Sequence, residues 1–213
     1  PMNAVIGFSQ VLLRQQQLQP QQQDMVNRIL SNGKNLLALI NDILDLSKIE
    51  TGRLAFSPET FDLAQLVRMT VTELRSLADQ KQLPIYLSLT LTDPLIYNDR
   101  LRLRQVLVNL LSNAIKFTQT GHVRITASEP RPDLLVLEVE DTGIGIAEAD
   151  QNHIFEEFRQ IDQSLSKRFP GTGLGLTITN LLVHKMGGAI SVTSEVDKGS
   201  IFRVELPRHL GQN

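Results

Sequence analysis

Apolar residues recur at helical spacing from the first residues of this chain. Val5, Phe8 and Leu12 share one face and predict a helix over residues 1–14. Seven of the nine residues in the following stretch, 15–23, are glutamine, and a proline within it is incompatible with a continuous helix. We therefore expect the first helix to end in a solvated turn.

A second, longer helix is predicted from residue 24 to about residue 49, and Gly52 is a typical stop signal after it. Its apolar stripe consists of Val26, Ile29, Gly33, Leu36, Ile40 and Ile43, widened by Leu30, Leu37 and Leu44. This stripe is too wide for a two-stranded coil and suits a four-helix bundle. Because one hairpin cannot enclose it, two copies are expected to pair as a homodimer. Alternatively, the stripe packs against the rest of the same chain.

The periodicity changes after Gly52 and indicates a second domain with both strands and helices. Strands are predicted at residues 54–56, 84–89, 123–127, 135–139, 189–194 and 201–206, and helices at 63–79, 99–117 and 173–186. Strands and helices without regular alternation indicate an α+β class, an α/β sandwich with helices on one face of a mixed, mostly antiparallel sheet. The predicted domains are residues 1–52 and 53–213.

Composition narrows the classes of function. The chain has 21 basic and 23 acidic residues, so its charge gives no bias toward nucleic acid. It has no cysteine, which excludes disulfides and thiolate metal sites and fits a reducing compartment. No apolar run reaches the roughly 18–20 residues that a bilayer span needs. We expect a cytoplasmic piece of a protein whose membrane anchor, where it has one, lies upstream.

A carboxylate followed by alternating glycines is the first candidate for chemistry. Asp141 comes directly after an alternating strand, and Gly143 and Gly145 follow it. A carboxylate at a strand end can accept a hydrogen bond from an amine such as the exocyclic amino group of adenine. Glycines beside it let a flat ring approach the backbone. The motif therefore favours a nucleotide base.

A second glycine-rich stretch opens the helix predicted near the C-terminus, with Gly171, Gly173 and Gly175 at alternate positions. Free N–H groups and partial positive charge at a helix start suit phosphate groups. The spacing does not fit the Rossmann fingerprint, and no Gly-x-x-x-x-Gly-Lys-Ser/Thr sequence is present. The two most common nucleotide-binding motifs are therefore excluded.

The third candidate is a helix that carries Asn109 and Asn113 four residues apart, hence on one face, with Lys116 near its end. The oxygen of an asparagine amide is a neutral ligand suited to Mg²⁺, which keeps most of its waters and shares phosphate oxygens. Polar residues on a helix also simply face solvent. The two spaced asparagines and the lysine, ahead of both glycine motifs, favour a magnesium–phosphate site.

Taken in their order along the chain, the motifs closely resemble the N, G1, F and G2 boxes of sensor histidine kinases. The boxes are Asn109…Asn113-Ala114-x-Lys116-Phe117, Asp141-x-Gly143-x-Gly145, Phe155-Glu156-Glu157-Phe158 and Gly171-Thr172-Gly173-Leu174-Gly175-Leu176. The resemblance continues through Met186-Gly187-Gly188 and Gly199-Ser200-Ile201-Phe202 to Leu206-Pro207 and covers nearly the whole chain. It implies the ATP-binding fold shared with DNA gyrase and mismatch-repair ATPases.

The resemblance also implies roles for individual residues. Asp141 would read adenine, Asn113 with help from Asn109 would hold Mg²⁺, and residues 159–170 would form a lid over ATP. The implied nucleotide-binding set is Asn109, Asn113, Lys116, Phe117, Asp141, Gly143, Gly145, Ile146, Phe158, Lys167, Arg168, Gly171, Thr172, Gly173, Leu174, Gly175, Leu176 and Ser200. The implied cofactors are ATP and Mg²⁺.

The first residues resemble the sequence that follows the phosphoacceptor motif His-Glu-x-x-Thr-Pro of this family. Pro1 would be the proline of that motif, so the histidine would lie before residue 1, and no catalytic residue of this kind is expected within the chain. The four histidines present lie outside such a context and have no metal-ligand spacing: His122, His153, His184 and His209.

Three functional hypotheses remain. The favoured one is the core of a histidine kinase that phosphorylates an upstream histidine and passes the phosphoryl group to an aspartate of a response regulator receiver domain, with a sensor domain upstream in the parent protein. The second is a degenerate module that binds nucleotide and a partner without phosphotransfer. The third is a related ATPase or serine kinase, which the sequence of residues 42–50 disfavours because it resembles the kinase dimerisation helix.

Overall fold

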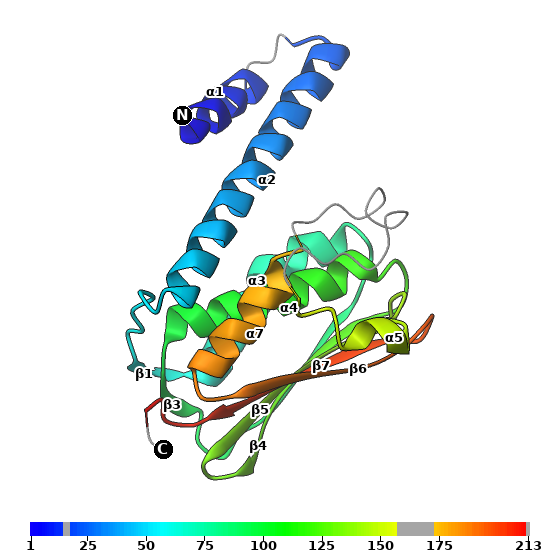
Figure 1. The fold of residues 1–213 in the computed structure, drawn as a ribbon. Helices are drawn as coiled ribbons and strands as arrows, with labels where there is room; N and C mark the ends of the chain where they lie inside the picture. Colours follow the sequence, from blue (N-terminus) through cyan, green and yellow to red (C-terminus); the bar gives the residue numbers. More distant parts are fainter. Residues whose placement is uncertain (15–17, 157–172, 212–213) are drawn as a thin grey trace. The chain divides into compact units, whose positions relative to one another are not determined.

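A computed structural model describes residues 1–14, 18–156 and 173–211. The chain divides into two compact units, Pro1–Arg53 and Leu54–Asn213. A helical hairpin followed by an α/β unit confirms the predicted fold class (Figure 1). Among the described residues, no helix is both long enough and apolar enough to cross a membrane.

The first unit is a hairpin of α1 (Met2–Arg14) and α2 (Pro20–Glu50). The prediction that residues 21–23 belong to a turn was wrong, because α2 begins at Pro20. A proline suits the first turn of a helix, where its missing N–H has no intrahelical partner. The backbone N–H of Gln19 donates to Oε1 of Gln22 at 3.0 Å, which holds the helix start.

The predicted apolar stripe of α2 has two parts. Val26 and Gly33 are buried, and a Cβ at Gly33 would lie only 3.3 Å from Ile6 of α1, so this part packs inside the hairpin. The other part is exposed in the single chain and comprises Ile29, Leu36, Ile40, Ile43 and Leu44. Five large apolar side chains are therefore left on one helix face.

The second unit is built on a five-stranded sheet with the strand order β2-β4-β5-β7-β6. The strands are β2 (Ile85–Thr90), β4 (Val123–Arg131), β5 (Leu134–Asp141), β6 (Ala189–Glu195) and β7 (Gly199–Pro207). The β2–β4 pair is parallel and the other three pairs are antiparallel, as expected for a mixed, mostly antiparallel sheet. The two central pairings place Asp141 at the end of β5, opposite Ser200 at the start of β7.

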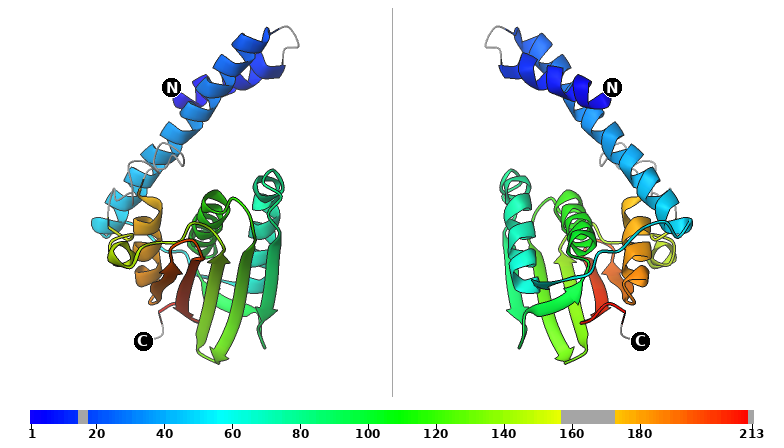
Figure 2. Two further views of the ribbon diagram at one scale, coloured as in Figure 1. Left: turned by 90° about the vertical axis from the view of Figure 1, so that its right-hand side faces the viewer. Right: turned by 90° about the vertical axis from the view of Figure 1, so that its left-hand side faces the viewer.

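Three helices cover one face of this sheet (Figure 2). They are α3 (Leu63–Asp79), α4 (Arg100–Phe117) and α7 (Gly175–Lys185), and a single turn, α5 (Glu148–Gln151), precedes α7. Asp62 and Asp99 cap α3 and α4 by accepting from the N–H groups of Gln65 and Arg102. The core between the layers is apolar and includes Leu63, Leu103, Leu107, Leu111, Ile125, Leu137, Leu174 and Leu182.

A second, two-stranded sheet pairs β1 (Glu59–Asp62) with β3 (Leu95–Asn98). The predicted strand at residues 54–56 was wrong, since those residues form no strand. The pairing instead begins at Glu59, and Phe61 supplies the buried side chain of β1. β3 was missed in the sequence, because four residues next to a proline give too short an alternation.

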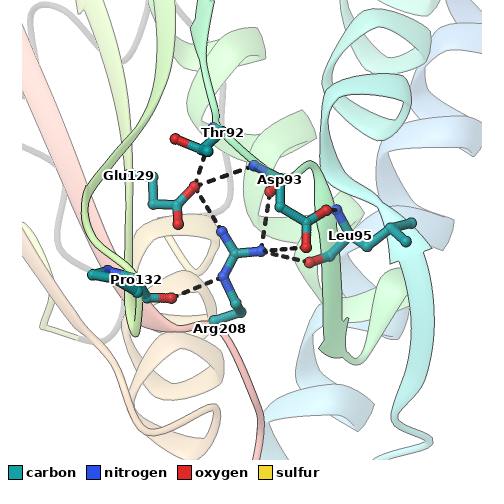
Figure 3. Close-up of polar contacts among 6 residues, drawn as sticks. All are labelled: Thr92, Asp93, Leu95, Glu129, Pro132 and Arg208. Atoms are coloured by element: carbon teal, nitrogen blue, oxygen red, sulfur yellow. Dashed lines mark hydrogen bonds and ion pairs between the residues drawn. The ribbon is translucent and has the colours of Figure 1, made fainter.

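The segment after β7 is fixed by Arg208, whose side chain is almost fully buried. Its Nε donates to the carbonyl of Pro132 at 2.9 Å, and its Nη1 donates to the carbonyls of Asp93 and Leu95 at 3.0 and 2.8 Å. Its Nη2 lies 2.7 Å from Oε2 of Glu129, whose side chain is 10% exposed (Figure 3). One guanidinium thus joins the β2–β3 loop, the β4–β5 hairpin and the C-terminal segment.

Candidate functional site

The last turn of α4 brings three predicted residues together. Asn113 makes no side-chain hydrogen bond within the described part of the chain, so its amide is available to a ligand. Partial burial lowers the pKa of Lys116. The Lys116 ammonium lies 4.6 Å from the centre of the Phe117 ring, a cation–π distance. This turn offers a neutral oxygen ligand and a positive charge side by side.

Asp141 is buried at the end of β5, with 6% of its surface exposed. Burial raises its pKa to about 6, although hydrogen bonds from the backbone N–H groups of Gly143 and Ser200 partly oppose this. The Gly143 N–H lies 2.8 Å from Oδ1. The carboxylate is therefore held in place by backbone donors, yet its charge is incompletely compensated. A buried carboxylate of this kind is a typical functional-site group.

The loop after Asp141 packs so closely that its glycines are required. A Cβ at Gly143 would lie 2.6 Å from the carbonyl oxygen of Phe117, the last residue of α4. Gly145 has φ +67° and its Cα faces the carbonyl of Glu195 without room for a side chain. The loop thus lies against both α4 and the β6–β7 turn, and Ile146 after it is buried.

A hydrogen-bond network that the sequence did not predict holds this loop. Ser194 Oγ accepts from the N–H of Ile146 at 2.8 Å and lies 2.9 Å from the hydroxyl of Ser200. Gln151 of α5 donates to the carbonyls of Ile146 and Ser194 at 3.1 and 2.8 Å. These contacts join segments more than forty residues apart in sequence. No local pattern could have indicated Ser194 or Gln151.

The start of α7 lies against α4 through Asn109. Its Nδ2 donates to Thr179 Oγ1 at 2.7 Å, and a Cβ at Gly175 would collide with its Oδ1. Asn109 therefore joins α4 to α7, and its contribution to a metal site stays a prediction. Gly173 has φ +72°, and Leu174 before the helix is fully buried, which orients the first turn. Leu176 lies in that turn and is half-buried.

Five predicted residues lie outside the described part of the chain: Phe158, Lys167, Arg168, Gly171 and Thr172. The predicted lid at residues 159–170 also falls there. Apart from Ser200 of β7, the remaining predicted residues lie on three segments: the second half of α4, the end of β5 with the loop after it, and the start of α7. Ser200 belongs with them through the backbone contact to Asp141.

The site's donor set suits a hydrated magnesium ion shared with phosphate rather than a metal held by protein alone. Within the described residues, no group of three or more His, Cys, Asp or Glu side chains could hold a metal ion. Asn113 supplies a neutral oxygen, and Mg²⁺ prefers to complete its shell with water and phosphate oxygens. An asparagine site next to Lys116 therefore fits a metal–nucleotide complex.

Two family models match the chain. Residues 98–210 match the model described as histidine kinase-, DNA gyrase B-, and HSP90-like ATPase. Residues 1–52 match the model of the His Kinase A (phospho-acceptor) domain. The first model covers most of the second unit, and the second model covers nearly all of the first unit.

Curated relatives and solved structures agree with these matches. The signal transduction histidine-protein kinase BarA of Escherichia coli is 41% identical over 100% of this chain and 24% of its own length. The autoinducer 2 sensor kinase/phosphatase LuxQ of Vibrio cholerae is 39% identical over 99% of this chain and 25% of its own length. The chain thus spans about a quarter of these relatives.

Among solved structures, full-length ShkA in complex with AMPPNP superposes with a TM-score of 0.80 at 33% identity, over 100% of this chain and 44% of that chain. The Acinetobacter baumannii histidine kinase AdeS superposes with a TM-score of 0.70 at 25% identity, over 97% of this chain and 95% of that chain. The likeness covers the hairpin as well as the α/β unit.

Proposed function

Because this chain belongs to the sensor histidine kinase family, we propose that its second unit binds Mg–ATP and donates the γ-phosphoryl group to a histidine. The observation that carries the proposal is the convergence of three segments. Three elements contribute: the end of β5 supplies the buried carboxylate of Asp141, and α7 supplies its start at Gly175. Helix α4 supplies the amide of Asn113, which has no hydrogen-bond partner among the described residues. Each suits a different part of the Mg–ATP complex, namely the base, the metal ion and the phosphates.

Different residues would bind the adenine base and the magnesium ion. Ionised Asp141 accepts a hydrogen bond from the exocyclic amine of adenine, and Gly143 and Gly145 hold the adenine loop close against the end of α4 and the β6–β7 turn. Asn113, with help from Asn109, holds Mg²⁺, which supplies charge neutralisation of the phosphates when bound.

Phosphate groups are held by positive charge and by N–H groups at a helix start. Lys116 provides an ammonium beside the phosphates, and the first turn of α7, from Gly175, provides backbone donors. Catalysis of phosphoryl transfer depends mainly on such positioning and charge compensation. The unit therefore needs no nucleophile of its own. It needs a correctly presented acceptor.

The acceptor histidine is proposed to precede Pro1 in the parent protein, within the first unit's helical hairpin. From there the phosphoryl group would pass to an aspartate of a response regulator receiver domain in the cytoplasm. We propose residues 1–52 as the dimerisation and phosphotransfer domain and residues 53–213 as the ATP-binding domain. An upstream sensor domain would set the activity.

The dimer predicts a specific effect at Ile40. Its side chain is 38% exposed in the single chain and lies among the exposed apolar residues of α2. Ile40→Glu should weaken dimerisation by about tenfold or more, since a carboxylate would have to be buried at the interface. Analytical ultracentrifugation measures the dissociation constant. Ser31→Glu adds the same charge on the opposite, exposed side of α2 and should leave it unchanged.

A monomeric wild-type chain at high concentration, with no effect of Ile40→Glu, would contradict the bundle. The stripe would then pack against the chain's own second domain, which is the alternative interpretation of its width.

Phosphotransfer separates a kinase from a degenerate binding module. The 213-residue chain incubated alone with radiolabelled ATP should gain no acid-labile label, because its four histidines lie outside the phosphoacceptor motif. Mixed with a longer chain that carries the upstream histidine and Asn113→Ala, it should label the longer chain through a mixed dimer. The same mixture made with Asn113→Ala in both chains should stay unlabelled.

Label on the 213-residue chain alone would instead point to one of its own histidines. Nucleotide binding without labelling of the longer chain would favour the degenerate module.

A further inference from the structure

Lys81, a lysine outside the predicted site, contacts the last turn of α4. The Lys81 ammonium donates to the carbonyl oxygens of Ile115, Lys116 and Thr118 at 2.7, 2.8 and 3.1 Å. Lys81 comes from the turn between α3 and β2, and these acceptors are 34 to 37 residues away in sequence. It makes three bonds to one helix end, and among the described residues its ammonium pairs with no carboxylate.

The turn that carries Lys81 is itself fixed. The N–H of Lys81 donates to the carbonyl of Ala78 at 3.0 Å, and Gln82 adopts φ +56°, a conformation that reverses the chain. Leu83 is buried directly after it. The lysine is therefore presented to α4 by a tight, anchored turn, rather than reaching it as a free surface side chain.

Lys81 completes the capping of α4. The last carbonyls of a helix have no intrahelical partner and carry about half a negative charge together. Thr118 satisfies the carbonyl of Ala114 through its N–H and its hydroxyl, at 3.1 and 2.7 Å. Lys81 satisfies the next two, Ile115 and Lys116. These two residues thus bond three of the last four carbonyls of the helix, those of Ala114, Ile115 and Lys116.

The same turn carries the residues assigned to the metal and the phosphates. Asn113 and Lys116 lie in it, and the carbonyl of Phe117 faces Gly143 of the adenine loop. Without Lys81, uncompensated carbonyl oxygens would stand next to a bound polyphosphate. We propose that Lys81 is a positioning residue that fixes this turn and cancels its negative end, so that the phosphates of the nucleotide can bind. This inference rests on the proposed function.

Adenosine and ADP distinguish this role from a purely structural one. Adenosine depends on the adenine loop alone, whereas ADP also places two phosphates beside the end of α4. Lys81→Met should weaken Mg–ADP binding by about tenfold, since it removes a charge and three charge-assisted hydrogen bonds, and should change adenosine binding by less than about twofold. Lys81→Arg, which keeps charge and donors, should restore most of the ADP affinity. Lys81→Gln, which keeps donors without charge, should lie between.

The experiment is a calorimetric titration of the whole chain with Mg–ADP and with adenosine. Lys185→Met, which removes a charge from an exposed lysine of α7, is the matched control and should leave both affinities unchanged. Equal ADP affinity in Lys81→Met and wild type would overturn the inference. So would an equal loss for ADP and adenosine without rescue by Lys81→Arg, because that pattern indicates general loosening. Failure of the wild-type chain to bind either ligand would instead overturn the proposed function.

Discussion

Arg208→Met is expected to lower the free energy of unfolding of the α/β unit by about 3–5 kcal/mol, the range found when one partner of a buried ion pair is removed. Glu129 would lose the cation at 2.7 Å and stay buried as a carboxylate. The carbonyls of Pro132, Asp93 and Leu95 would lose their donor as well. Methionine keeps the apolar stem of arginine, so the loss reports mainly on the guanidinium.

Urea denaturation followed by circular dichroism measures this difference. Arg131→Met is the matched control, because among the described residues the Arg131 side chain makes no polar contact beyond an exposed ion pair with Asp133 at 3.8 Å. Its loss should change stability by less than about 0.5 kcal/mol. The double variant Arg208→Met/Glu129→Gln should recover part of the loss, since the one carboxylate that still loses its cation, Asp93, is 60% exposed. Equal stability of Arg208→Met and wild type would show that the C-terminal segment does not depend on this cluster.

Local sequence signals predicted the long elements of the fold well. The helix expected at residues 63–79 coincides with α3, because an aspartate cap at Asp62 and a clear apolar face mark its start and length. Alternation likewise predicted β4, β5 and the β6–β7 hairpin. The strand expected at 54–56 failed because alternation over three residues does not determine a pairing partner, whereas β1 and β3 depend on each other.

The candidate site was predictable only where a motif carries it. Recognisable motifs contain Asp141, Asn113 and the glycines. The structure places those motif residues that lie in its described part on neighbouring elements. Lys81 and Ser194 were not predictable, since the backbone groups of Ile115 and Ile146 that they bond to are 34 and 48 residues away, and a lysine in a turn resembles any solvated lysine. Asn109 shows a further limit, because spacing placed it beside Asn113 but could not indicate its bond to Thr179.

The second large effect is expected at Asp141. Asp141→Asn should weaken ADP binding by at least about tenfold, because adenine loses its bond to a buried carboxylate, a contact worth about 1.5–3 kcal/mol. Glu140→Gln removes the neighbouring carboxylate, which pairs with Arg124 at 2.8 Å and acts on Asp141 through its charge, which helps to raise the pKa of Asp141. It should leave ADP affinity at neutral pH unchanged.

The raised pKa of Asp141 adds a pH dependence with a defined sign. Its value of about 6 in the folded chain exceeds the ordinary value of 3.8, because burial disfavours the charge. The folded state therefore binds more protons between these values, and its stability falls as pH rises through this window. Adenine needs the ionised form, so ADP affinity should fall by about tenfold per pH unit below the pKa. The ADP affinity of Asp141→Asn should lack this pH dependence and should keep only the dependence caused by titration of the phosphates.

The most direct test of the nucleotide site is the ADP dissociation constant of Asp141→Asn relative to wild type, measured by calorimetry with Mg²⁺ at about pH 7.5, where Asp141 is ionised. We predict micromolar-range or tighter binding by the wild-type chain and a loss of at least about tenfold in the variant. An unchanged dissociation constant would contradict the assignment of the buried carboxylate at the end of β5 to adenine.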